Sequence, residues 1–425
     1  MEKTITIAGA GMGSIDGMTE ELLKEAERAD LIIGTERILR PFERCGKKIL
    51  QEYRAEEIRQ IVDHAPEQKI LILVTGDQGF YSAGQKIAKQ LSSYHPRIIP
   101  GISSIAYFSA VTGIPYTGAA LVSAHGRQVN IVSVVRRNRI TFVLAGGNLS
   151  ALLKKLCEYD YEDLEIFTGE NLSSEDERIR HGTARELLEQ SKQDAFSKLS
   201  LMVVLHREAQ ESTPVGIADE AFVRGTVPMT KREVRALIIS SLRLNADSVV
   251  VDIGAGTGSV SVEAALNAYR GTVYAIERKV EAQELITVNA KRFHTDNIHV
   301  IEGEAPEAMA DLPFADAYYI GGSRGRMREI LEEIRKAGKE RIPSGEENDV
   351  PMQKENKREI IRIVISAVTL QTLTEMQRLQ EEMPLQNVSV TQIQAARSRK
   401  IGRYDLMKAE NPVFIISADL QVNTD

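Results

Sequence analysis

Short apolar runs alternate with amphipathic stretches along the first half of the chain. Residues 19–28 have the apolar spacing of a helix, and strands are predicted at residues 4–8, 31–34, 69–74, 141–144 and 200–205. Strands that alternate with helices indicate a layered α/β domain. The pattern fades at 208–226, a polar stretch with Pro214, Gly216 and Gly225 that we interpret as a linker.

A second alternating series follows this linker. Residues 230–242 have a helical apolar face, and seven strands are predicted at residues 248–252, 272–277, 297–301, 315–320, 359–367, 387–394 and 412–418. Such a series predicts a Rossmann-like, doubly wound sheet. Residues 338–357 break the rhythm and are interpreted as a surface insertion. We therefore expect one domain over 1–207 and another over 227–425.

The composition of the chain argues against several classes of function. Of the 425 residues, 43% are hydrophobic and 27% charged, as in a globular protein, and no apolar run approaches a membrane span. The net charge of −7 argues against a general nucleic-acid binder. Cys45 and Cys157 lack metal-ligand spacing, so no metal is expected. We expect a cytoplasmic protein without membrane or nucleic-acid partners.

Two basic clusters stand out against this acidic background. They are Arg136-Arg137-Asn138-Arg139 and Arg397-Ser398-Arg399-Lys400. Each suits a small polyanion, and each could equally be a solvated helix end or loop.

The strongest chemical signal lies between Val249 and Glu277. A buried strand ending at Asp252 leads into the glycine loop Gly254-Ala255-Gly256-Thr257-Gly258 and then into a helix. This spacing differs from the dinucleotide pattern Gly-x-Gly-x-x-Gly and suits a ligand without a pyrophosphate. Glu277 ends the next strand, where a carboxylate can accept both hydroxyls of a ribose. The pattern favours S-adenosylmethionine over a nicotinamide or flavin cofactor.

Further motifs in the second half, together with the glycine loop, resemble those of a known family. Val227-Pro228-Met229-Thr230-Lys231, DIGAGTGSVSVEAA, AIER, GEAPEA, YYIGGS and Asn411-Pro412-Val413-Phe414 resemble the decarboxylating precorrin C15-methyltransferase family of cobalamin biosynthesis over residues 220–420. The resemblance implies the class I methyltransferase fold. It also implies S-adenosylmethionine contacts at Thr230, Gly254, Ala255, Gly256, Thr257, Gly258, Glu277 and Ala305.

The first half carries its own set of loop motifs after predicted strands. These are Gly9-Ala10-Gly11-Met12-Gly13, Val74-Thr75-Gly76-Asp77-Gln78-Gly79-Phe80, Pro100-Gly101-Ile102-Ser103-Ser104 and Ser123-Ala124-His125-Gly126-Arg127. Together they resemble the tetrapyrrole methylase family over about residues 1–207, in particular its precorrin C5-methylating branch. The resemblance implies two α/β lobes and a second S-adenosylmethionine bound by Gly11, Asp77, Phe80, Ser103 and Ser104. The family usually has proline where Gln78 stands, so the shape of that loop is open.

Two such domains in this order resemble the bifunctional C5,C15-methyltransferases that act on precorrin-6B. The resemblance implies methylation at C5 and C15, decarboxylation of the ring C acetate and a tetrapyrrole substrate, and both families commonly self-associate. For gripping substrate carboxylates we select Arg324 and Arg326, and in the first domain His125 or Arg127; solvated or purely structural roles are the alternatives.

Other functions and several details stay open at this point. The alternative functions are an RNA methyltransferase and an NAD-linked oxidoreductase. The sequence leaves undecided whether the substrate carries cobalt, which methylation comes first, whether intermediates are channelled and how many copies assemble.

Overall fold

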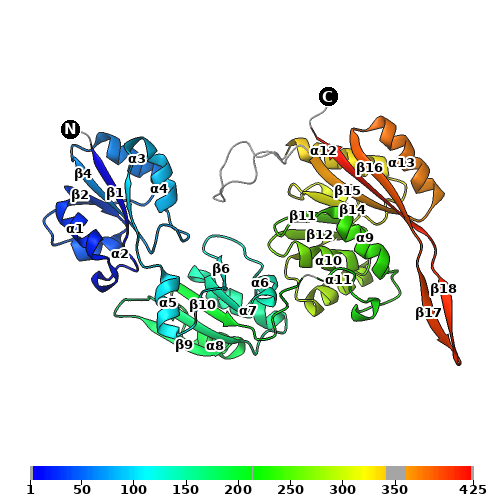
Figure 1. The fold of residues 1–425 in the computed structure, drawn as a ribbon, viewed down its shortest axis with the longest axis horizontal. Coiled ribbons are helices and arrows are strands. Elements are labelled where there is room, and N and C mark those ends of the chain that lie inside the picture. The colour runs from blue at the N-terminus through cyan, green and yellow to red at the C-terminus, as the bar shows by residue number, and fades with distance from the viewer. Residues whose placement is uncertain (1–2, 213, 341–359, 423–425) are drawn as a thin grey trace. The chain divides into compact units, whose positions relative to one another are not determined.

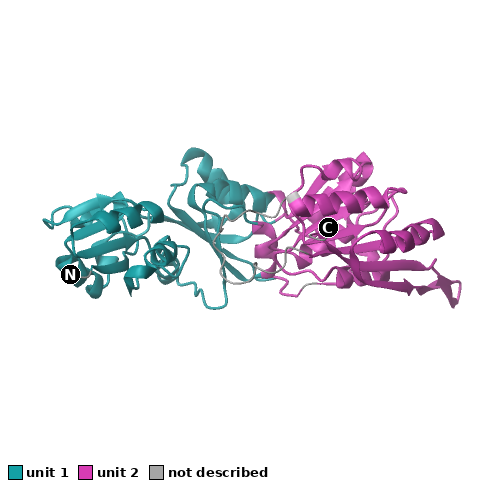
Figure 2. Ribbon diagram, turned by 90° about the horizontal axis from the view of Figure 1, so that it is seen from above, with its two compact units in different colours: residues 1–129, 138–157, 161–208 teal, residues 130–137, 158–160, 209–425 magenta. Residues whose placement is uncertain are grey.

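The computed structural model describes residues 3–212, 214–340 and 360–422. The chain forms two compact units: residues 1–129, 138–157 and 161–208 make the first, and residues 130–137, 158–160 and 209–425 the second (Figure 2). No helix in these described ranges combines the length and the apolar character needed to cross a bilayer. Each unit is described separately below.

The first unit begins with a parallel five-stranded sheet in the order β3-β2-β4-β1-β5 (Figure 1). Its strands are β1 (Thr4–Gly9), β2 (Leu31–Gly34), β3 (Lys48–Gln51), β4 (Lys69–Val74) and β5 (Arg97–Ile99). Apolar residues of α1 (Glu20–Arg28) and α2 (Glu36–Leu39) pack on one face of the sheet. Those of α3 (Ala55–His64) and α4 (Gly84–Gln90) pack on the other. Both faces are therefore covered, as parallel sheets require.

A second, mixed sheet in the order β6-β7-β10-β8-β9 completes this unit. Its strands are β6 (Ala120–Ser123), β7 (Ile140–Leu144), β8 (Glu165–Glu170), β9 (Arg178–Thr183) and β10 (Ser200–Leu205), and its helices are α7 (Leu149–Glu158) and α8 (Ala184–Gln193). The helix α5 (Ser104–Thr112) follows β5 and places Phe108 against Phe142 of this sheet. The two expected α/β lobes are thus present.

The second unit contains the expected doubly wound sheet of seven strands, in the order β13-β12-β11-β14-β15-β19-β16. All neighbours are parallel except β19, which runs antiparallel to β15 and β16. The strands are β11 (Val249–Ile253), β12 (Thr272–Glu277), β13 (Ile298–Glu302), β14 (Ala317–Ile320), β15 (Ile360–Ala367), β16 (Leu385–Ile393) and β19 (Val413–Gln421).

Helices cover both faces of this sheet. On one face pack α9 (Arg232–Leu242) and α10 (Ser259–Asn267). On the other pack α12 (Met327–Glu340) and α13 (Leu370–Glu382). The remaining described helices of the unit are α6 (Ile131–Arg137) and α11 (Val280–Arg292). Short 3-10 turns occur in this unit at Asp219–Ala221 and Glu307–Met309, and in the first unit at Ile15–Gly17, Arg40–Phe42, Ser92–Tyr94 and Gly146–Asn148.

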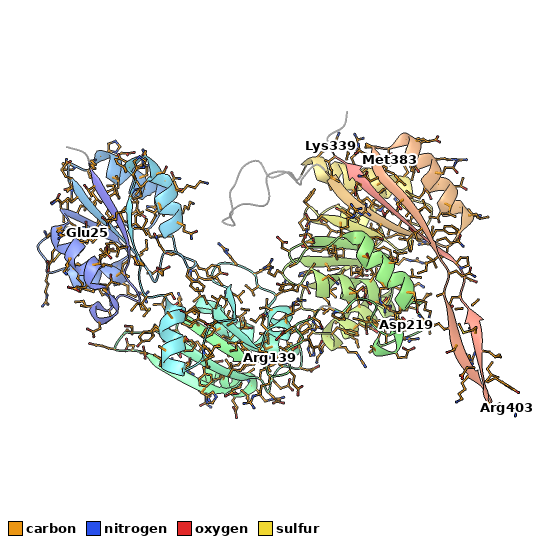
Figure 3. The ribbon with its side chains drawn as sticks, in the orientation of Figure 1. Glu25, Arg139, Asp219, Lys339, Met383 and Arg403 are labelled. Atoms are coloured by element: carbon orange, nitrogen blue, oxygen red, sulfur yellow. The ribbon has the colours of Figure 1, made fainter. Side chains whose placement is uncertain are left out.

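One feature of the second unit was not predicted, and one predicted feature lies mostly outside the described residues. A two-stranded hairpin, β17 (Ala396–Ile401) with β18 (Tyr404–Ala409), extends from the sheet, with Arg403 at its tip (Figures 1 and 3). The predicted insertion at 338–357 begins inside α12, and from residue 341 on it lies outside the described residues.

The two basic clusters are only partly built into the fold, since Arg139, Arg399 and Lys400 are exposed. Arg136 is buried and donates a hydrogen bond to Gln210, and Arg137 stacks over the Tyr269 ring. Arg397 forms ion pairs with Asp219 and Glu233. The solvated alternative is therefore wrong for Arg136, whereas the Arg397 side chain is ion-paired and 33% exposed.

Candidate functional site

The glycine loop joins β11 to α10 at the carboxyl edge of the large sheet. Gly254, Gly256 and Gly258 all have positive φ, between 58° and 76°. A Cβ at Gly256 would lie 3.3 Å from the Pro228 carbonyl oxygen, and one at Gly258 would lie 3.0 Å from the Ile286 side chain. Side chains at these two positions would therefore combine backbone strain with crowding. The loop therefore needs glycine at these positions, as the sequence predicted.

Glu277 fixes this loop from the neighbouring strand. β11 and β12 pair in parallel, so the end of β12 lies beside the start of the loop. One carboxylate oxygen of Glu277 accepts the amide of Gly256 at 3.0 Å, and the other accepts the amides of Arg278 and Lys279 at 2.9 and 3.0 Å. Three amides hold the carboxylate in place at the sheet edge.

Asp252 lies directly beneath the loop and is fully buried. Ser261 donates a hydrogen bond to one of its oxygens, and the other oxygen has no hydrogen-bond partner. Burial, together with the nearby charge of Glu277, raises the pKa of Asp252 to about 7. Near neutral pH this carboxyl therefore titrates.

A cavity of about 480 Å³ opens above these residues. Of the predicted cofactor residues, its wall includes Thr230, residues 254–256, Glu277 and Ala305. Thr257 is buried, with its carbonyl accepting a hydrogen bond from Asn289, and Gly258 caps α10, so both shape the loop from behind. A cavity of this volume suits one nucleoside-sized ligand.

The two arginines selected for substrate carboxylates have carboxylate partners within the chain. Arg324 lines the cavity and forms an ion pair with Glu304 at 3.0 Å. Arg326 pairs with Glu307 and Glu329, and it is not among the cavity-lining residues.

A pair of hydroxyls in the cavity wall was not identified from the sequence. The Tyr319 hydroxyl lies 2.9 Å from the Ser366 hydroxyl, and both residues line the cavity. Burial raises the pKa of Tyr319 to about 12, so the phenol stays protonated at neutral pH. Each residue is the penultimate one of its strand, β14 or β15, and this shared position is the signal that could have identified them.

A buried ion cluster of Arg235, Glu263 and Asp219 lies behind the cavity wall at Thr230. Arg235 is fully buried and donates hydrogen bonds to Glu263, to Asp219 and to the Thr230 carbonyl oxygen, the last at 2.7 Å. Glu263 also accepts the amides of residues 216 and 217. These contacts dock part of the predicted linker onto the second unit, so we propose that the domain boundary lies near residue 208.

In the first unit, as at the glycine loop of the second, the loops that follow parallel strands meet at the carboxyl edge of the sheet. The carboxyl ends of β4, β1 and β5 are adjacent in the sheet, and a Cβ at Gly101 would lie 2.4 Å from the carbonyl oxygens of Gly9 and Gly76. Gly11 and Gly76 exchange backbone hydrogen bonds at 2.7 and 3.3 Å. Asp77 accepts the amides of Gly79 at 2.8 Å and Gly101 at 3.2 Å. The predicted residues Gly11 and Asp77 thus lie together at one sheet edge.

The remaining predicted residues of the first unit surround this edge. Ser103 caps α5 by accepting the Ala106 amide at 3.1 Å, and Ser104 is the first residue of that helix. Phe80 follows Asp77 and contacts the Tyr81 ring edge-on.

His125 and Arg127 are exposed on the loop after β6. The hydroxyl of Tyr81 donates a hydrogen bond to the Leu121 carbonyl oxygen of β6 at 3.3 Å. The loop of Asp77 and the strand that leads to His125 are therefore in contact.

The residues of the second unit fit S-adenosylmethionine. The glycine loop admits a ligand close to the backbone, Glu277 is placed for a ribose, and the Tyr319–Ser366 pair supplies polar contacts at the β14–β15 side of the cavity. No group of three or more potential metal ligands occurs in the described part of the chain.

Comparisons with known proteins match each half of the chain. The family of tetrapyrrole (corrin/porphyrin) methylases matches residues 4–188, and the precorrin methyltransferase domain matches residues 220–342. A probable cobalt-precorrin-6B C(15)-methyltransferase (decarboxylating) of Pyrobaculum calidifontis is 42% identical over 210 residues, 49% of this chain and 96% of that protein. A precorrin-6Y C(5,15)-methyltransferase [decarboxylating] of a Sinorhizobium species is 26% identical over 79% of this chain and 83% of its own length. A crystal structure of a precorrin-6y C5,15-methyltransferase from Geobacter metallireducens is 35% identical, covers 48% of this chain and 97% of that chain, and has a TM-score of 0.41.

Proposed function

The chain belongs to the decarboxylating precorrin methyltransferases of cobalamin biosynthesis, and from this premise we propose that it methylates precorrin-6B, or its cobalt form, at C5 and at C15. The first domain would methylate C5. The second would methylate C15 and release the ring C acetate as carbon dioxide. The observation that carries the proposal is the glycine-walled cavity with Glu277 at its edge, in a chain whose other half is a tetrapyrrole methylase.

S-adenosylmethionine supplies a methyl group on a cationic sulfonium, which an electron-rich ring carbon can attack in line. The chain needs no covalent nucleophile, because its contribution is alignment and exclusion of water. Glu277 and the loop 254–256 would hold the nucleoside end, and the wall at Thr230 would close the cavity.

Decarboxylation passes the electron pair of the lost carboxylate into the conjugated macrocycle. The chain would favour this step by holding that carboxylate against a poorly solvated wall and binding the other carboxylates by cations. We propose that Arg324 exchanges Glu304 for a substrate carboxylate, and that Arg326 orients the 321–326 loop through Glu307 and Glu329.

In the first domain we propose a second S-adenosylmethionine at the edge formed by Gly11, Asp77 and Gly101, with Phe80, Ser103 and Ser104 around it. Asp77 would act by tying the two loops into a fixed cradle. His125 and Arg127, exposed on a loop whose strand contacts the Asp77 loop, are our candidates for meeting the tetrapyrrole.

We also propose that the chain acts in the cytoplasm as a homo-oligomer. The hairpin exposes several large apolar side chains, which a second copy could cover: Ile401, Tyr404, Leu406 and Met407.

The test is anaerobic incubation of the full chain with S-adenosylmethionine and precorrin-6B, with and without cobalt, followed by mass spectrometry. The expected product has gained two methyl groups and lost one carbon dioxide. An unchanged tetrapyrrole in both incubations would refute the proposal.

A further inference from the structure

The cofactor cavity has one cationic side chain whose position suggests a second ligand. Among the described residues four cations line the cavity: Lys231, Arg278, Lys279 and Arg324. Arg324 is paired with Glu304, Arg278 and Lys279 are exposed, and in this part of the chain no carboxylate lies within ion-pair distance of the Lys231 ammonium. Lys231 is half-buried and immediately precedes α9, between the Thr230 wall and the hairpin base. An ammonium in this position can bind an anion that does not belong to the chain.

A second hollow adjoins the cavity at this lysine. It has a volume of about 400 Å³ and shares Lys231, Val234 and Val413 with the cavity wall. Its far wall is the base of the hairpin, residues 408–411 and Ala395. Three residues line both spaces, so the second hollow directly adjoins the cofactor cavity on this side.

The position of the second hollow along the large sheet indicates which ligand it would bind. Glu277 ends β12 and Ala305 follows β13, on one side of the cavity, so a nucleoside bound there would leave its reacting end toward β14 and β15. Val413 begins β19, the next strand beyond β15, and the second hollow starts there. A methyl acceptor would therefore meet the reacting end of the cofactor on the side of the second hollow.

The charges of the second hollow suit carboxylates at two points. Lys231 lies at its inner end and Lys408 at the hairpin. Of the two acids in the wall, Glu233 is bound by Arg397, which lowers the pKa of Glu233 and keeps it ionised in that ion pair. Glu410 is the other acid. A precorrin carries acetate and propionate groups around its rim, so neighbouring carboxylates can reach both lysines.

We propose that the second hollow is a subsite for the rim of the tetrapyrrole, with Lys231 and Lys408 binding its peripheral carboxylates. This inference rests on the proposed methylation of precorrin-6B by the same domain. It assigns substrate binding to residues other than the arginine pair that the sequence pointed to.

Lysine-to-methionine variants of the full chain test the subsite, because methionine keeps most of the side-chain length and removes the charge. Lys231→Met should raise KM for precorrin-6B about tenfold, because it removes a half-buried hydrogen bond from a charged donor. Lys408→Met, in a more exposed position, should raise it about threefold. For Lys408→Met, which lies outside the cofactor cavity, KM for S-adenosylmethionine should stay unchanged.

Lys400→Met is the matched control, because Lys400 is exposed on the same hairpin but is not part of the hollow. Its KM values should equal those of the wild type. If the wild type methylates precorrin-6B and both test variants keep its KM for that substrate, the subsite is refuted and the proposed function stands. If the wild type binds S-adenosylhomocysteine but leaves precorrin-6B unmodified, both proposals fall.

Discussion

At the scale of single residues, the two acids expected to anchor a cofactor share a structural feature. Glu277 accepts three backbone amides and Asp77 accepts two. In each case the carboxylate ties together loops that follow parallel strands of one sheet: β11 and β12 are neighbours, and β4 and β5 lie on either side of β1. Their sequence positions, at or just after a strand end, indicated that they belong to the site. Their hydrogen bonds to the backbone depend on tertiary contacts, which one sequence does not reveal.

Asp252 gives a prediction about pH. Its pKa is raised from its ordinary value near 4 to about 7 by burial, so the folded chain binds this proton more tightly than the unfolded chain does. The residue therefore stabilises the fold below the ordinary pKa, and this contribution is lost as the pH rises toward 7. Asp252→Asn cannot ionise, so its stability relative to the wild type should increase between pH 5 and pH 8, by about 3 kcal/mol at most. Chemical denaturation at both pH values measures this, and parallel changes in the two proteins would contradict the prediction.

At the scale of elements, the predicted and observed strands agree where the sequence has a clear pattern of apolar residues. The ends of β12 match the predicted strand, and the other strands of the large sheet shift by up to three residues at either end. The inner strands of this sheet are mostly buried and read as continuous apolar runs, whereas the edge strands β13 and β16 are partly or fully exposed at every position. The hairpin was not predicted because β18 is exposed at every position, so neither alternation nor an apolar run marks it. The segment that docks through Asp219 and Phe222 was interpreted as a linker because its buried residues are few and separated by polar ones.

The hairpin is attached to the second unit through Arg397, and this attachment can be tested. Arg397 binds Asp219 and Glu233, and Asp219 also binds the buried Arg235. Arg397→Ala leaves Asp219 with one arginine and should lower the free energy of unfolding by about 1–2 kcal/mol. Arg399→Ala, two residues along the same strand and exposed, should have no effect. Denaturant unfolding of both variants measures this, and equal stabilities would show that the ion pair contributes nothing.

At the scale of the whole molecule, two unrelated α/β architectures place their functional loops by the same rule. In each unit, glycine-containing loops follow adjacent parallel strands and converge at the carboxyl edge of the sheet. The fold class of both halves followed from the order of elements and from the loop motifs. The cavity wall at Tyr319, Ser366 and Lys231 could not be predicted, because it brings together segments distant in sequence.

The central claim is that each half binds its own S-adenosylmethionine, and calorimetric titration of the full chain with S-adenosylhomocysteine tests it most directly. The wild type should take up two molecules per chain. Gly256→Val and Gly101→Val, which crowd one loop each, should each leave a single site. Uptake of one molecule or none by the wild type, or of two by either variant, would contradict the claim.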